Sequence, residues 1–93
     1  MKERRLKSRL AEDLRDPVVR KAFEEEDIPA RLAIRIAKLR EQQGLTQKAL
    51  AGKLHISQQA LSQLEDPASA RYSLRTLQRI ATALGRRLVV ELR

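Results

Sequence analysis

Residues 46–65 read TQKALAGKLHISQQALSQLE, and the expected fold follows from this stretch. Thr46 and Ser57 are residues of the type that caps helix N-termini, so they predict two short helices over 47–54 and 57–65, separated by a tight turn. Apolar or small residues fall where two crossing helices would touch: Leu50, Ala51, Leu54, Ile56, Leu61 and Leu64. A large side chain at Ala51 would hold the helices apart, so its small size favours a close crossing.

This pattern is typical of a helix-turn-helix, in which the second helix enters the major groove of DNA. Four polar side chains are predicted on the outward face of the second helix: Gln58, Gln59, Ser62 and Gln63. Glutamine can pair bidentately with N6 and N7 of adenine, which is direct readout of a base edge. We therefore expect these four residues to read the sequence of double-stranded DNA, with Ala60 available to touch a thymine methyl group.

The flanking sequence predicts three more helices. Asp16-Pro17 is an N-cap followed by proline at the first helical position, and it begins a helix over 17–26. Pro29 begins a helix over 29–43 that Gly44 ends, and two apolar stripes along it indicate that it is covered from two sides. Ser73 caps the last helix, which Gly85 ends. Leu6, Leu10 and Leu14, at i, i+4 and i+8, indicate a further helix over 1–14.

Four segments carry a resemblance to a known family: LREQQGLTQ (39–47), LAGKL (50–54), ISQQALSQLE (56–65) and LRTLQRIATALG (74–85). Residues 32–84 resemble the Cro/C1-type helix-turn-helix proteins, also called the XRE family. The resemblance implies an all-α, five-helix, lambda-repressor-like domain that binds a palindromic operator as a homodimer. His55 stands where the family usually has Gly, and positive φ is uncommon for other residues. We expect His55 to be a solvent-facing turn residue; a phosphate contact is the alternative.

Other residues suit the DNA backbone rather than the bases. The resemblance implies a phosphate contact for Gln47. Residues at the starts of the two helices and basic residues nearby are further candidates: Thr46, Lys48, Lys53, Ser57, Arg71 and Arg75. For each Lys or Arg taken singly, a solvated surface charge is an equally good interpretation.

The C-terminal residues 86–93 predict a short β-strand with Leu88, Val90 and Leu92 on one side. A lone strand has unpaired edges and needs a partner. We expect it to pair with the same strand of a second copy, giving a two-fold dimer; packing against the N-terminal segment of its own chain is the alternative. The chain thus divides into an extension (1–27), a DNA-binding domain (28–85) and a dimerisation strand (86–93).

Charge and composition narrow the function further. The 93 residues contain 20 Lys and Arg against 12 Asp and Glu, a net charge of +8. Residues 1–27 hold eight of each sign, so the whole excess lies in residues 28–93, as expected for binding an anionic partner. With no Cys, one His and no Gly-rich phosphate loop, the sequence indicates no metal, no cofactor and no enzymatic activity. No apolar run is long enough to span a membrane, and we expect a cytoplasmic protein.

The neutral extension needs a separate explanation. An N-terminal extension, a helix-turn-helix domain and the final ALGRRLVVEL segment resemble HigA-class antitoxins, which bind a small mRNA-cleaving toxin of the RelE/HigB type and repress their own operon. The candidate toxin-binding residues are Leu10, Leu14, Val18, Phe23, Glu24 and Glu25. A stand-alone repressor without a toxin partner is the alternative. A helix-turn-helix used only for protein bridging is disfavoured by the outward glutamines.

Overall fold

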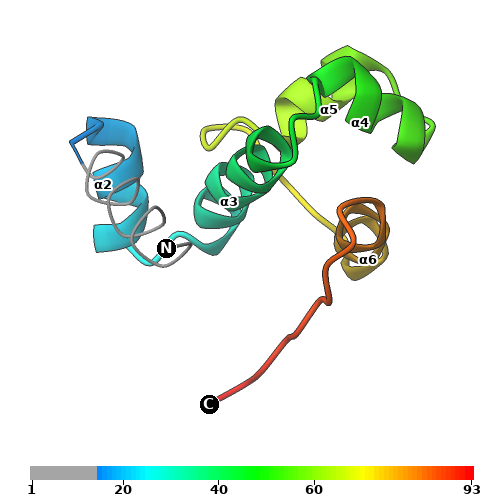
Figure 1. The fold of residues 1–93 in the computed structure, drawn as a ribbon. Coiled ribbons are helices and arrows are strands. Elements are labelled where there is room, and N and C mark those ends of the chain that lie inside the picture. Colours follow the sequence, from blue (N-terminus) through cyan, green and yellow to red (C-terminus); the bar gives the residue numbers. More distant parts are fainter. Residues whose placement is uncertain (1–14) are drawn as a thin grey trace.

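The computed structural model describes residues 15–93, and within that range it contains five α-helices and no strand (Figure 1). The helices are α2 (Pro17–Glu24), α3 (Ile28–Gln42), α4 (Gln47–Leu54), α5 (Gln58–Leu64) and α6 (Leu74–Ala83). The prediction of helical structure is confirmed for all five segments, with ends shifted by one or two residues. The helix suggested over 1–14, and with it Leu10 and Leu14, lies outside the described residues.

Side-chain caps begin the helices at the residues that the sequence indicated. The hydroxyl oxygens of Thr46, Ser57 and Ser73 accept hydrogen bonds from backbone N–H groups three residues later, at 3.0, 3.0 and 3.1 Å. The Asp16 carboxylate accepts from the N–H of Val18 at 2.9 Å. Asp27, for which the sequence analysis predicted no cap, also caps α3 by accepting a hydrogen bond from the N–H of Ala30. Each cap satisfies a donor that the helix itself leaves unpaired.

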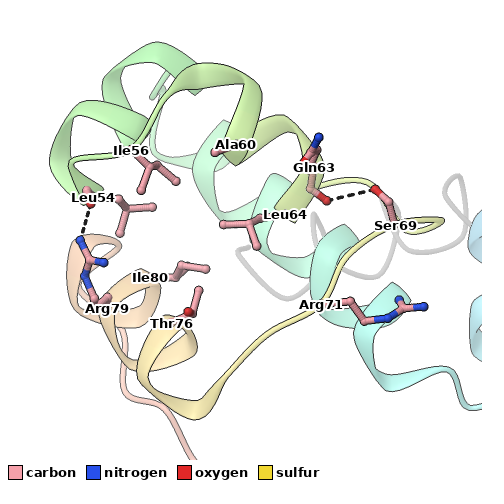
Figure 2. A pocket seen from close by; sticks show the side chains of 10 residues that line it. All are labelled: Leu54, Ile56, Ala60, Gln63, Leu64, Ser69, Arg71, Thr76, Arg79 and Ile80. Carbon is pink, nitrogen blue, oxygen red and sulfur yellow. Dashed lines mark hydrogen bonds between the residues drawn. The ribbon is translucent and has the colours of Figure 1, made fainter.

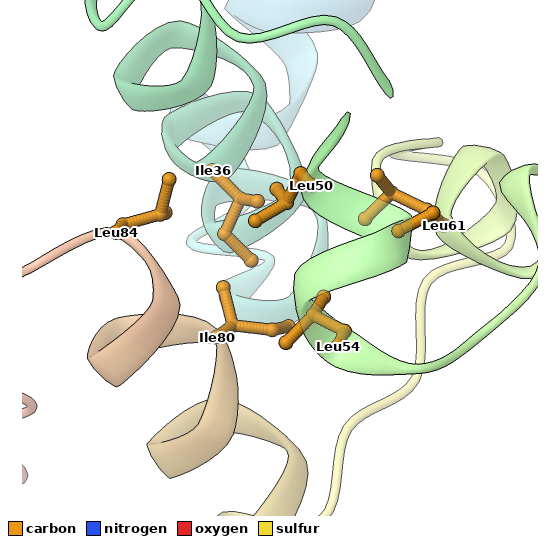
Figure 3. Packing of buried hydrophobic residues seen from close by; sticks show 7 residues of the cluster. Ile36, Leu50, Leu54, Leu61, Ile80 and Leu84 are labelled. Carbon is orange, nitrogen blue, oxygen red and sulfur yellow. The ribbon is translucent and has the colours of Figure 1, made fainter. Parts of the chain in front are cut away.

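The hydrophobic core lies around α4 (Figure 3). Leu50, Ala51 and Leu54 of α4 pack with Leu61 of α5, Ile36 of α3, Ile80 of α6 and Leu84, the C-cap of α6. Leu50 and Leu61 are completely buried. The predicted inward residues of the two central helices are therefore confirmed, and Ile56 and Leu64 cover the edge of the same cluster. Because α4 contacts both α5 and α6, it fixes how α5 is presented to solvent.

The α2 helix packs on α3, away from this core (Figure 1). Val19 and Ala22 of α2 and Ala30 and Ala33 of α3 are buried. Since Ile36 of α3 joins the central core, α3 is covered from two sides, as its two apolar stripes predicted. The α2 part of the N-terminal segment is thus joined to the rest of the fold through apolar contact.

The predicted C-terminal strand does not form in this single chain, and that part of the fold prediction is not supported. The N–H of Arg86 still bonds to the carbonyl of Ala81 at 2.8 Å, after which the chain leaves α6 without regular structure (Figure 1). Leu88 is half-buried, whereas Val90 and Leu92 are exposed. The physical reason is that strand hydrogen bonds need a neighbouring strand, and residues 15–85 offer none.

Candidate nucleic-acid interface

The outward face of α5 is polar and open to solvent. Gln58, Gln59, Ser62 and Gln63 are all exposed, while Leu61 on the opposite face is buried. The structure therefore brings the four predicted base-reading residues together on one accessible surface. Uncharged amide and hydroxyl groups on such a helix can donate to and accept from base edges.

The N-termini of α4 and α5 present the capping hydroxyls of Thr46 and Ser57. Each hydroxyl oxygen already accepts a backbone N–H bond, at 3.0 Å in both cases. A hydroxyl that accepts in this way still has its own hydrogen to donate, so both caps can also reach a phosphate oxygen. Lys48 is exposed in the first turn of α4 and would add charge there.

A buried ion pair holds α5 against the rest of the domain. Arg40 Nε lies 2.7 Å from Glu65 Oε2, and Arg40 Nη2 lies 2.9 Å from Glu65 Oε1. Arg40 Nη1 also donates to the carbonyl of Leu45 at 2.8 Å. The side chains of Arg40 and Glu65 are only 11% and 4% exposed, and the hydrogen bond to Glu65 raises the pKa of Arg40, with burial opposing the shift. Because Glu65 is the C-cap of α5, this pair joins the end of that helix to α3.

Gln47 belongs to the same network. Its amide Nε2 donates to Glu65 Oε1 at 3.1 Å, and its side chain is half-buried. An amide nitrogen has two hydrogens, so one is committed inward and one is left for an outside acceptor. The predicted phosphate contact is therefore compatible with this position, but Gln47 also has an internal role that the sequence did not indicate.

Two further side chains cap the ends of the two central helices. The Tyr72 hydroxyl donates to the carbonyl of Leu64 in α5. Arg79 of α6 donates to the carbonyl of Leu54 in α4 (Figure 2). Burial raises the pKa of Tyr72 to about 12, and the negative charge of Glu65 adds to the shift. Sequence analysis missed Arg40, Tyr72 and Arg79, because their partners are backbone carbonyls or a distant carboxylate. A glutamate directly after a recognition helix was the one available signal.

The turn between α4 and α5 has the predicted backbone. His55 is the C-cap of α4 in the left-handed conformation, with φ 56° and ψ 41°, and it is exposed. Both of its predicted properties as a turn residue, positive φ and exposure, are therefore confirmed. The N–H of Ile56 bonds to the carbonyl of Ala51 at 3.0 Å, which closes the helix end.

The remaining basic candidates lie on other parts of the surface. Lys53 is exposed near the end of α4, and Arg71 and Arg75 are exposed on either side of the α6 cap. Arg71 Nη1 donates to the carbonyl of Ala70 at 2.7 Å. A hollow of about 350 Å³ separates the inner side of α5 from α6, with Gln63 and Arg71 among the residues that line it (Figure 2). The basic groups thus lie outside α5, whose own residues carry no charge.

Short helices packed around α4, with an exposed polar face on α5, define a DNA-binding domain. A model of the family described as Helix-turn-helix, the Cro/C1 type, matches residues 36–90, more than half of the chain. The chain belongs to this helix-turn-helix family and is a DNA-binding regulator; the family is generally non-enzymatic. The comparison with curated proteins found no match, and neither did the comparison with solved structures. Over residues 15–93, no helix is both long and apolar enough to cross a membrane.

Proposed function

We propose that the protein is a sequence-specific repressor that reads its operator with α5. The observation that carries this proposal is the exposed row of uncharged polar side chains on α5: Gln58, Gln59, Ser62 and Gln63. Their amides and hydroxyl can discriminate base pairs in the major groove, whereas charge alone favours any DNA. The buried Arg40–Glu65 pair supports this role, because it fixes the orientation of the helix that would read the bases.

Backbone contacts supply the affinity in this proposal. The residues assigned to phosphates are exposed, apart from the half-buried Gln47: Thr46, Gln47, Lys48, Lys53, Ser57, Arg71 and Arg75. The excess positive charge of residues 28–93 favours the same partner. His55, exposed at the turn, is a further candidate for a phosphate.

The proposed operator-binding form is a homodimer paired through residues 86–93. Leu88, Val90 and Leu92 alternate along this segment, and the last two are exposed in the single chain. A second copy can supply the missing strand partner, and two-fold symmetry matches a palindromic operator with half-sites about one helical turn apart.

The proposed second activity is that of an antitoxin, which binds a small basic ribonuclease of the RelE/HigB type. Support comes from the part of the extension that packs on the domain. Residues 24–27 (EEED) are exposed, and so are apolar Val18 at the start of α2 (55%) and Ile28, which follows the acidic run (66%). Exposed acidic and apolar groups within one segment would suit a basic surface that evolved to hold RNA. Glu24, Glu25 and Val18 are the described candidates; Phe23 lies in the same helix.

Two experiments test these activities separately. Selection of bound duplexes from a random DNA library should yield one palindromic consensus; recovery of unrelated sequences would contradict the repressor proposal. Co-expression with the adjacent gene should rescue growth from that gene's toxicity and yield a stable complex. If the neighbouring product is not a small basic ribonuclease-like protein and no complex forms, the chain is a stand-alone repressor.

A further inference from the structure

An apolar groove lies between α3 and α6, where the C-terminal segment leaves the domain. It has a volume of about 470 Å³, and its walls include Leu32 and Leu39 of α3 and Leu77 of α6. Three arginines also line it: Arg35, Arg86 and Arg87. Of the apolar residues in the C-terminal segment, only Leu88 is half-buried here, whereas Val89, Val90 and Leu92 are at least 60% exposed. Exposed apolar groups beside an apolar groove indicate a surface that another chain covers.

The alternation along this segment shows which side faces the groove. Side chains of an extended chain alternate between two sides, so Leu88, Val90 and Leu92 share one side and Arg87, Val89 and Glu91 share the other. Because Leu88 is the half-buried member, the side with Leu88 is the one turned toward the domain. Arg87 and Val89 of the other side also line the groove but are exposed, Val89 at 69%, and the Glu91 side chain is 61% exposed.

We propose that the C-terminal segments of two copies pair antiparallel across these grooves in a register centred on Val89, with Glu91 directly opposite Arg87 of the second copy. This inference rests on the proposed homodimer and adds to it the register and the charges that select the register. The occupant of the groove is thus a second copy of this chain. Its Val90 would lie beside Leu88, over the same apolar walls.

Charge complementarity selects this register. In a two-fold antiparallel pair, only a register centred on a residue keeps the apolar sides together. Centring on Val90 would place Arg87 opposite Arg93, and centring on Glu91 would place that carboxylate opposite itself; like charges directly opposite are destabilising. Centring on Leu88 would pair Glu91 with Gly85. Centring on Leu92 would place Glu91 opposite Arg93 but would pair only residues 91–93. The register centred on Val89 is therefore the longer one with an opposite-charge pair, Glu91 with Arg87, and symmetry forms this pair twice.

The ion pair between Glu91 and Arg93 within one chain does not prevent Glu91 from pairing with Arg87 of a second copy. In the single chain, Glu91 Oε2 lies 2.9 Å from Arg93 Nη2, and the two side chains are 61% and 87% exposed. An exposed ion pair and a directly opposite cross-strand ion pair are each worth about 0.2–1 kcal/mol, so replacing Arg93 by Arg87 of the second copy is close to neutral for Glu91. Since Glu91 is the only acidic residue in 67–93, the choice of basic partner on the second copy is what defines the register.

Charge reversal in the full-length chain tests the register. Either Arg87→Glu or Glu91→Arg should raise the dimer dissociation constant, measured by analytical ultracentrifugation at low salt, about two- to thirtyfold. The double variant Arg87→Glu/Glu91→Arg should return it to within about threefold of the starting value. The matched control is Arg93→Glu/Glu91→Arg, which restores only the contact within one chain. Equal rescue by the control, or tighter dimers from Arg87→Glu alone, would overturn the register.

A crosslink provides a second, independent measurement, because the chain has no cysteine of its own. Val89→Cys should form a disulfide dimer under mild oxidation, since symmetry places residue 89 opposite itself within disulfide reach. Val90→Cys is the control and should crosslink far less. The reverse result would show a register centred on Val90. A chain that stays monomeric at all concentrations would refute both the dimer and the register, whereas a dimer indifferent to these changes would refute the register alone.

Discussion

Arg40 and Glu65 form a bidentate ion pair across 25 residues of sequence, with N–O distances of 2.7 and 2.9 Å. Glu65 ends α5 and Arg40 lies in the last turn of α3, so the pair joins the proposed recognition helix to the helix that carries the extension. Gln47 donates to the same carboxylate from the start of α4. One buried carboxylate therefore sets the relative positions of three helices.

Removing the Arg40 side chain should lower the stability of the folded chain. Arg40→Met leaves the Glu65 carboxylate buried without its cation, and we expect the free energy of unfolding to fall by about 3 kcal/mol. Arg40→Met/Glu65→Gln should recover part of the loss, because the remaining buried group is neutral. The control is Arg20→Ala, which removes the exposed Arg20–Glu24 pair and should change stability by less than about 0.5 kcal/mol. Equal losses in urea unfolding for Arg40→Met and Arg20→Ala would contradict this role.

Tyr72 should make stability fall in strongly alkaline solution. Its pKa is raised to about 12 in the folded chain, above the value of about 10 expected when unfolded, so the folded state holds this proton more tightly. The associated stability is complete below pH 10 and is lost as the pH rises toward 12. Tyr72→Phe should lower stability at neutral pH by about 1 kcal/mol through the lost bond to Leu64. The measurement is the difference in unfolding free energy between the two chains at pH 8–12. This difference in unfolding free energy should shrink as the pH rises. A constant difference would refute the stabilising role of the protonated Tyr72 hydroxyl.

Substitution by alanine should have opposite effects on protein stability at Gly52 and at Gly44. An added Cβ meets nothing within 4 Å at either position, but Gly52 lies inside α4 whereas Gly44 has φ +71°. Gly52→Ala should therefore stabilise the protein by about 0.5–1 kcal/mol through helix propensity. Gly44→Ala should destabilise it by about 1 kcal/mol, because alanine is strained in the left-handed region. Thermal unfolding measures both, and the same sign for the two variants would refute the argument from backbone conformation.

Substituting base-reading residues and substituting phosphate-contacting residues should weaken DNA binding in different ways. Gln58→Ala or Gln59→Ala should cost about 1–3 kcal/mol on the selected operator and relax preference at one base pair. Lys53→Ala or Arg75→Ala should instead weaken binding to all DNA sequences alike and reduce the salt dependence. Fluorescence anisotropy with matched and mismatched duplexes at several salt concentrations measures both effects. Identical behaviour of the two groups would show that the roles are wrongly divided.

Dimerisation and DNA binding should be linked through the C-terminal segment. Deleting residues 89–93 should yield monomers, because the proposed partner strand is lost, and operator affinity should fall with the loss of the second half-site. Ultracentrifugation and anisotropy on the same preparation measure the two effects. A truncated chain that still dimerises would place the interface elsewhere.

Most of the fold could be predicted because its determinants are local. A capping side chain acts within three residues, as Thr46, Ser57 and Ser73 do, and a glycine or His55 in the left-handed region ends a helix at one residue. The inward faces of α4 and α5 follow from residues three and four apart, which is why Leu50, Leu54 and Leu61 were predicted correctly. The exposed face that carries Gln58 and Gln59 follows from the same periodicity.

The remaining features depend on contacts between residues far apart in sequence. Nothing local to Arg40 indicates that its partner is Glu65, or that Arg79 meets the carbonyl of Leu54, because both pairs are 25 residues apart. The C-terminal strand shows the opposite case: residues 86–93 have the alternation of a strand but no strand structure, since a strand requires hydrogen bonds from another chain segment. Periodicity and capping thus establish the helices and their polar and apolar faces. Contacts between residues far apart in sequence determine how the helices pack together, and only a partner strand could complete the C-terminal segment.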